Sequence, residues 1–222
     1  MKTGLTQFTL VLDRSGSMES IKDATIAGVN EFILAQKHVP SEANIYAVKF
    51  DTEYEIIYEG SLGAMPLLDG NSYQPRANTA LHDAIGRAIT HTGQTLASQP
   101  EQERAEKVIF AIMTDGLENA SREYDREKIA QMVKLQREIY KWEFLYLGAN
   151  QDAVLVGEQL NIPRSHSVTY AAAPANVMSV IRGMSANAQM YRQGVGGARA
   201  MAFTNEQRNE AVIADDVREA AK

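Results

Sequence analysis

Short apolar runs and stretches of helical period alternate along most of this 222-residue chain. The runs have the length of β-strands, and the stretches between them carry apolar residues three and four positions apart, which indicates amphipathic helices. Strands that alternate with helices pair in parallel, because each helix carries the chain back across the sheet. The predicted strands span 9–12, 43–50, 54–60, 107–113, 142–147 and 167–170, and the predicted helices span 18–36, 79–96, 124–140, 152–160 and 174–191.

One connection is too short for a parallel crossover. Only residues 51–53 separate the strands 43–50 and 54–60, so the second strand is predicted to be an antiparallel edge strand. The order of elements therefore predicts an α/β fold: a doubly wound, mostly parallel open sheet with one antiparallel edge strand and helices on both faces. Residues 61–77, rich in Gly, Pro and Asn, are expected to form a loop with one short turn around 66–68.

The chain divides into one regular part and one irregular part. Residues 1–192 are predicted to form a single domain, and the pattern of strands and helices stops after Gln193. Residues 194–197 read as a flexible break between the two parts. We expect 193–222 to be a flexible C-terminal tail in which 204–221 is either a marginal helix or disordered, available for a partner or an oligomer contact.

Composition excludes several classes of protein. The chain has no cysteine, so it has neither a disulfide framework nor a thiolate metal site, which fits a reducing cytoplasm. No apolar segment is long enough to span a bilayer and no signal peptide is evident, so we expect a cytoplasmic protein without a membrane partner. The net charge of −6 disfavours nucleic acid as the main partner.

Three separate loops carry side chains with oxygen atoms that could bind a metal ion. Asp13, Ser15 and Ser17 follow the first apolar run, Thr79 opens a helix, and Asp115 follows the strand 107–113. Ligand sites of open α/β sheets lie beyond the carboxyl ends of the strands, and hard divalent cations prefer oxygen ligands. Capping of the next helix explains the acid and the serines equally well when they are considered alone.

The pattern Asp13-x-Ser15-x-Ser17, then Thr79, then Thr114-Asp115-Gly116 resembles a von Willebrand factor A domain with an intact metal-ion-dependent adhesion site. The likeness is to stand-alone bacterial and bacteriophage members and covers roughly residues 5–192. It implies Mg²⁺, with Mn²⁺ or Ca²⁺ as substitutes. In the family the hydroxyls supply metal oxygens and the two carboxylates bind directly or through water. One position is left for an Asp or Glu of a protein partner.

The resemblance therefore implies a protein-binding module that is not an enzyme. Two alternatives stay open: a structural or assembly subunit with a stabilising metal, and a metal-dependent phosphoryl or phosphodiester hydrolase. The second is disfavoured because Ser15 stands where haloacid-dehalogenase-like phosphatases carry a second Asp. The motifs G-x-S-x-G, Walker A and G-x-G-x-x-G are also missing.

Four further polar residues lie near the predicted loops. His82 and Asp83 occupy the first turn of a helix, where they either support the metal ligands or, as we expect, form a solvent-facing pair with a favourable charge at the helix start. Asn150 and Asp152 follow the strand 142–147. They either line the rim of the site or cap the next helix.

Overall fold

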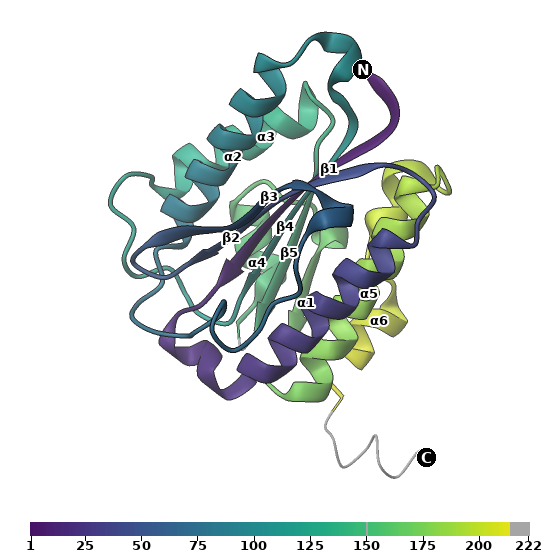
Figure 1. Cartoon of the computed structure of the whole chain (residues 1–222). Coiled ribbons are helices and arrows are strands. Elements are labelled where there is room, and N and C mark those ends of the chain that lie inside the picture. Colours follow the sequence, from purple (N-terminus) through teal and green to yellow (C-terminus); the bar gives the residue numbers. More distant parts are fainter. Residues whose placement is uncertain (150, 214–222) are drawn as a thin grey trace, which may run out of the picture.

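The computed structural model describes residues 1–149 and 151–213 as a six-stranded sheet flanked by helices (Figure 1). The strand order is β3-β2-β1-β4-β5-β6, and every neighbouring pair is parallel except β2 and β3. The predicted fold class, with its antiparallel edge strand, is confirmed. The strands are β1 (Lys2–Asp13), β2 (Ala43–Phe50), β3 (Tyr54–Ser61), β4 (Ala105–Thr114), β5 (Glu143–Ala149) and β6 (Ser167–Tyr170).

Helices cover both faces of the sheet, with α1, α5 and α6 on one side and α2, α3 and α4 on the other. The α-helices are α1 (Lys22–Lys37), α2 (Leu81–Ser98), α3 (Arg126–Glu138), α4 (Ala153–Gln159), α5 (Pro174–Arg192) and α6 (Asn205–Glu210). Short 3₁₀ helices span Gly16–Ile21, Leu62–Ala64, Glu101–Glu103, Arg164–His166 and Gly197–Met201. In the described part of the chain, none of the helices has the length and apolarity needed to cross a bilayer.

The central strand β1 is buried on both faces. Its alternate residues Phe8, Leu10 and Leu12 join the core under α1 and α5, whereas Val11 joins the core under α2 and α3. The strand begins seven residues earlier than predicted. Its polar first half forms strand because Thr6 pairs with residues of both β2 and β4, a tertiary effect that local sequence does not reveal.

The predicted loop 61–77 is packed against the core. Leu62, Met65, Leu68 and Tyr73 are all buried, and a short 3₁₀ helix lies at Leu62–Ala64 instead of at 66–68. The side chain of Asn30 in α1 accepts a hydrogen bond from the Leu68 N–H at 2.7 Å and donates to the Leu68 carbonyl at 2.9 Å. The segment is therefore fixed to α1 before it reaches Thr79.

Helix α3 presents fewer residues to the core than its sequence pattern predicts. Ile129 and Val133 are fully buried, but Leu135 is 51% exposed and Ile139 is 64% exposed. The helix ends at Glu138, and its contact with the core is a narrow stripe of Ile129, Val133 and the partly buried Met132. The apolar spacing over 124–140 predicts an inward face of Ile129, Met132, Val133, Leu135 and Ile139, and this prediction is wrong for Leu135 and Ile139.

The predicted flexible tail also needs correction for the residues that the structure describes. Met201, Phe203 and Ala211 are buried against α5 and β6. The Ala171 N–H donates to the Ala211 carbonyl at 3.0 Å, and the Phe203 N–H donates to the Ser165 carbonyl at 2.8 Å. Part of the predicted helix is present as α6, which begins with a capping box at Thr204. The remainder of the tail prediction, 214–222, lies outside the described residues.

A chain that ends at Gln193 is expected to be several kcal/mol less stable than the full chain. The truncation uncovers core beneath Met201, Phe203 and Ala211, and burial of a large apolar side chain contributes about 1.5–3 kcal/mol. Urea unfolding of the full chain and of chains ending at residues 193 and 213 measures the effect. Equal midpoints for the full and the shortest chain would show that the segment adds no stability.

Candidate metal centre

The carboxyl ends of β1 and β4 lie side by side at the centre of the sheet. The two strands are parallel neighbours with Leu12 opposite Met113, so Asp13 and Thr114 end the strands together. The Thr114 hydroxyl donates to Oδ2 of Asp13 at 2.5 Å. Asp115 follows at once. The pairing of two strands that are far apart in sequence therefore brings both predicted carboxylates to one place.

The turn after β1 directs two hydroxyls to the same point. The Ser15 N–H donates to Oδ1 of Asp13 at 2.6 Å, which closes a tight turn. The Ser15 and Ser17 hydroxyl oxygens lie 3.2 Å apart, and Ser17 donates to Oδ1 of Asp115 at 2.5 Å. Four of the five predicted ligands are thus joined by direct hydrogen bonds.

The fifth predicted ligand, Thr79, reaches the site because its loop is held by the turn after β1. The Gly16 N–H donates to the Ala77 carbonyl at 3.1 Å, and the hydroxyl of the fully buried Tyr73 donates to the main-chain carbonyl of Asp13. Thr79 itself is buried, with 2% of its surface exposed.

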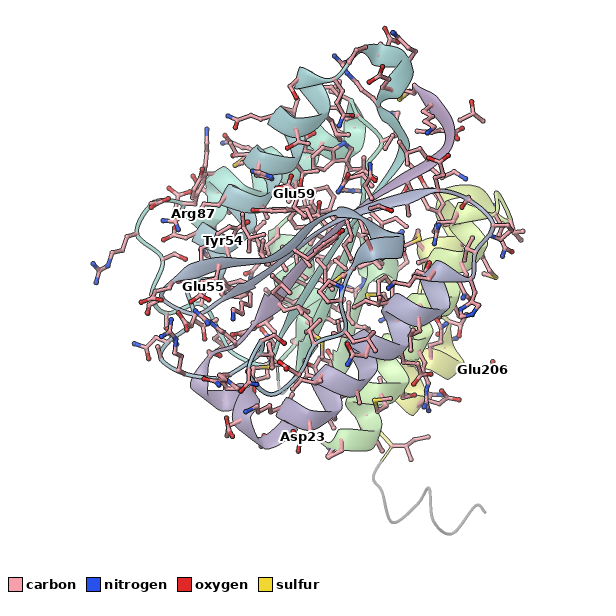
Figure 2. All side chains as sticks on the ribbon, in the orientation of Figure 1. Asp23, Tyr54, Glu55, Glu59, Arg87 and Glu206 are labelled. Atoms are coloured by element: carbon pink, nitrogen blue, oxygen red, sulfur yellow. The ribbon has the colours of Figure 1, made fainter. Side chains whose placement is uncertain are left out.

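An ion-pair network around the buried Arg14 and Asp51 supports this loop from the side of β2 and β3, where Glu55 is labelled in Figure 2. Nε of Arg14 lies 3.0 Å from the fully buried Asp51, and Nη2 lies 2.5 Å from Glu55. Nε of Arg76 donates to the same Asp51 carboxylate at 2.8 Å, and the backbone N–H of Arg76 donates to the Arg14 carbonyl at 2.7 Å. The Asp51 carbonyl accepts from the Ala80 N–H, so the network ends beside Thr79. Sequence reasoning identified none of these residues.

Gly116 leaves a small cradle between the three hydroxyls. A Cβ atom built on this glycine would lie 2.9 Å from the Thr79 hydroxyl oxygen and 3.7 Å from those of Ser15 and Ser17. One point thus lies close to hydroxyls from two different loops. The cradle exists only because residue 116 has no side chain.

Burial makes both carboxylates of the site difficult to ionise without a cation. Asp13 is fully buried, and burial raises its pKa from 3.8 to about 6 although hydrogen bonds from Thr114 and Ser15 lower it. Burial also raises the pKa of Asp115. Within residues 1–149 and 151–213, no lysine, arginine or histidine forms an ion pair with either acid. Among the described residues, the site therefore lacks a positive charge of its own.

The donor set fits a small hard cation. Two carboxylates balance a divalent charge, and three neutral hydroxyls add oxygen ligands without further repulsion, which suits Mg²⁺. Among the described residues no cluster of three or more His, Cys, Asp or Glu side chains is placed to hold a metal. A metal at this edge therefore depends on the hydroxyls.

The loop after Asp115 is fastened to the start of α2. The Thr79 N–H donates to Oδ1 of Asn119 at 2.9 Å, and the Asn119 N–H donates back to the Thr79 carbonyl at 3.1 Å. The Glu118 carboxylate accepts from the His82 N–H at 2.9 Å. These contacts couple the second and third loops of the site, and sequence reasoning identified neither Glu118 nor Asn119.

Asp83 is buried and fastens α2 to the backbone of residues 122–124, so the prediction of a solvent-facing pair is wrong for this residue. Only 9% of Asp83 is exposed, and its carboxylate accepts backbone N–H groups of Arg122, Glu123 and Tyr124 at 2.8–2.9 Å. Burial raises the pKa of Asp83, but the three N–H donors outweigh it and hold the pKa below its usual range. His82 is half-buried.

Replacing Asp83 by alanine is expected to destabilise the protein by about 2 kcal/mol at neutral pH, because three N–H groups lose their acceptor. Since its folded-state pKa is lowered, Asp83 stabilises the protein above pH 3.8, and this effect is lost as the pH falls through the folded value. Denaturant unfolding at neutral and acid pH tests both statements. Asp125→Ala, which removes an exposed helix cap, is the matched control, with a cost of about 1 kcal/mol. An Asp83→Ala cost no larger than the control's would contradict the fastening role.

Asp152 caps α4, which is one of the two roles predicted for it. Its Oδ1 accepts from the Leu155 N–H at 2.9 Å. The other residue predicted there, Asn150, lies outside the described residues. Gln151 reaches the site instead, because its Nε2 donates to the Gly116 carbonyl at 3.3 Å.

The fold is that of von Willebrand factor A domains. Similar solved structures include VWA2, the ArnB paralogue of Sulfolobus acidocaldarius, with a TM-score of 0.52 and 16% identity over 83% of this chain and 45% of that one. The von Willebrand factor domain of the pilus tip protein Mfa5 from Porphyromonas gingivalis has a TM-score of 0.57 and 12% identity, over 86% of this chain and 96% of that one. Proximal thread matrix protein 1 from the mussel byssus, with zinc in its MIDAS motif, has a TM-score of 0.56 and 12% identity, over 80% of this chain and 46% of that one.

At sequence identities of 12–16%, the likeness to these three structures shows a shared fold alone. The chain spans less than half the length of the first and third of these proteins. No family model and no curated protein matches the sequence.

Proposed function

We propose that this chain is a divalent-metal-dependent protein-binding module without catalytic activity. The metal is held by two carboxylates and three hydroxyls, and a carboxylate of the partner completes its coordination. The bound ion supplies Lewis acidity toward that carboxylate, and Mg²⁺ is the ion that the donor set favours. The proposed ligands are Asp13, Ser15, Ser17, Thr79 and Asp115.

The observation that carries this proposal is the cradle at Gly116, where hydroxyls of two loops surround one point beside two buried acids. Similar folds add support. One neighbour, from the mussel byssus, holds zinc at its MIDAS motif, and another is described as the pilus adhesin SpaC from Lactobacillus rhamnosus GG.

Exposure of the site favours an adhesive metal over a structural one. A metal that only stabilises the fold is expected to be enclosed by protein ligands. Here Gly16 and Ser17 are exposed and Gly116 is half-buried, so one side of the site faces solvent. This open side offers access to a partner's carboxylate.

Affinity capture from a host lysate tests the proposal. We expect the wild type to retain a partner in Mg²⁺ and to release it in EDTA, whereas Asp115→Ala retains nothing in either condition. Asp125→Ala, an acid-to-alanine change at a helix cap away from the site, is expected to behave like the wild type. Retention that is equal in Mg²⁺ and EDTA would contradict a metal-dependent interface.

A further inference from the structure

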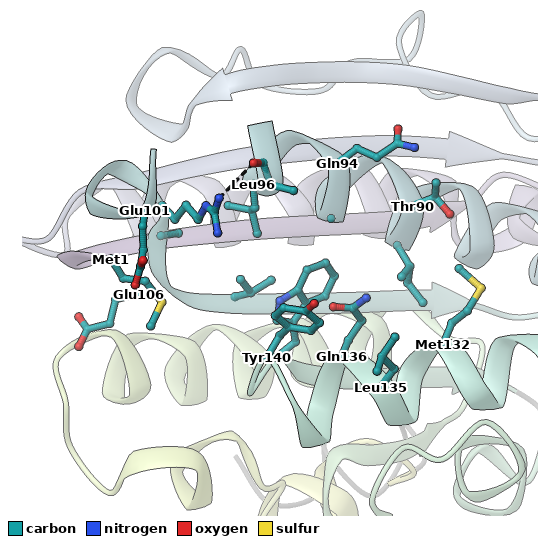
Figure 3. A pocket seen from close by; sticks show the side chains of 17 residues that line it. Met1, Thr90, Gln94, Leu96, Glu101, Glu106, Met132, Leu135, Gln136 and Tyr140 are labelled. Atoms are coloured by element: carbon teal, nitrogen blue, oxygen red, sulfur yellow. Dashed lines mark hydrogen bonds between the residues drawn. The ribbon is translucent and has the colours of Figure 1, made fainter. Parts of the chain in front are cut away.

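A second concave site lies between α2 and α3, on the face of the sheet that these helices cover (Figure 3). It is a cavity of about 630 Å³, within the usual range for small-molecule sites. Figure 3 shows Thr90, Gln94 and Leu96 of α2 on one side and Met132, Leu135 and Tyr140 on the other. Most of the lining is apolar, and the proposed metal ligands take no part in it.

The cavity is open because small residues of α2 face the only tryptophan of the chain. A Cβ atom built on Gly93 would lie 4.0 Å from Cη2 of Trp142 and would meet no closer atom. Ala97 is a second small lining residue in the same helix. A ligand in the cavity would therefore lie against the Trp142 indole.

Exposed apolar side chains gather at the same place. Met1, Leu135 and Tyr140 line the cavity and are 67%, 51% and 61% exposed. Large apolar side chains that cluster on a surface indicate a binding site more often than isolated ones do. Leu135, which the sequence pattern predicts to be buried, is therefore exposed as part of the cavity lining.

One cationic group of the lining has no carboxylate partner. Arg104 donates through Nε to the Gln99 carbonyl at 2.9 Å and through Nη2 to the Ala97 carbonyl at 3.1 Å. Within the described residues it forms no ion pair, although Glu101 and Glu106 line the same cavity. The Glu106 carboxylate is already held by the Gly4 N–H at 2.7 Å. Arg104 therefore remains available to an anionic group.

We propose that the cavity binds an amphipathic monocarboxylate, with its alkyl or aromatic body against Trp142 and its carboxylate at Arg104. The apolar lining accepts the body, and the guanidinium selects the charged end. The site lies apart from the metal centre and needs no metal, so this inference does not rest on the function proposed above.

The emission of the single tryptophan reports binding directly. Titration of the full chain with decanoate is expected to give a saturable change in Trp142 fluorescence, equal in Mg²⁺ and in EDTA. Gly93→Leu is expected to abolish the change, because its side chain fills the space beside the indole. Ser98→Leu adds the same side chain to α2 outside the cavity and should leave binding unchanged.

The charged end is tested with Arg104→Gln and with decanol as the neutral ligand. We expect this variant to bind decanoate about tenfold more weakly and decanol as the wild type does. A non-saturable response, binding by Gly93→Leu equal to that of the wild type, or loss of binding in EDTA would overturn the site. Equal losses for decanoate and decanol would overturn the role of Arg104.

Discussion

Asp13→Asn is expected to stabilise the metal-free protein and to abolish its stabilisation by Mg²⁺. Asp13 is fully buried without a cationic partner among the described residues, and burial raises its pKa from 3.8 to about 6. This rise in pKa corresponds to about 3 kcal/mol. The neutral amide avoids this cost, so the variant should unfold at higher denaturant concentration than the wild type in EDTA.

The direction of the pH dependence follows from the raised pKa. Protonated Asp13 favours the folded state, and this contribution is complete below pH 3.8 and lost as the pH rises through about 6. The variant and the wild type should therefore be equally stable in acid and differ at neutral pH. Denaturant unfolding in EDTA across this range measures the difference.

The substitution keeps the hydrogen bonds of the site. The amide oxygen can accept from the Ser15 N–H, and the amide N–H can donate to the Thr114 hydroxyl. That hydroxyl can then donate to the Gly116 carbonyl, 3.1 Å away. With Mg²⁺ at a thousandfold excess over Kd the order should reverse, because only the wild type gains binding energy, about 4 kcal/mol, which exceeds the burial cost of about 3 kcal/mol. A variant that is still stabilised by Mg²⁺ would contradict the role of Asp13.

Gly116→Ala is expected to weaken metal binding at least about a hundredfold, or about 3 kcal/mol, while the fold remains. The new methyl group would lie 2.9 Å from the Thr79 hydroxyl and 3.7 Å from the Ser15 and Ser17 hydroxyls, in the space proposed for the ion. Gly116 does not have a positive φ, so alanine causes no backbone strain.

Isothermal titration with Mn²⁺ measures the loss, and the circular dichroism spectrum checks the fold. Gly70→Ala is the matched control, because a Cβ there meets no atom within 4 Å. It should bind Mn²⁺ as tightly as the wild type. Wild-type affinity in Gly116→Ala would show that the metal lies elsewhere.

The strand ends and the loop residues of the candidate site could be predicted because their signals are local. Apolar runs that stop at Asp13 and Thr114 mark two strand ends, and parallel pairing brings such ends to one edge. The residues that hold the loops could not be found this way. Asp83 accepts from N–H groups 39 to 41 positions later, and no local pattern encodes such a pairing.

Tertiary packing explains the two largest errors in the fold prediction. Met201, Phe203 and Ala211 follow neither helical nor strand period, so their burial depends on contacts with α5 and β6. Leu135 fits the apolar period of α3, yet the cavity beside Trp142 leaves it exposed. Periodicity identifies apolar positions, and tertiary packing decides which of them are covered.

Relaxation of water protons by bound Mn²⁺ tests the central claim most directly, because it reports the metal and its open position together. The wild type is expected to enhance relaxation when Mn²⁺ binds, and acetate is expected to reduce the enhancement by displacing metal-bound water. Asp13→Asn should give no enhancement, and Asp125→Ala should behave like the wild type. Absence of enhancement in the wild type, or enhancement that acetate leaves unchanged, would contradict a metal that binds a partner's carboxylate.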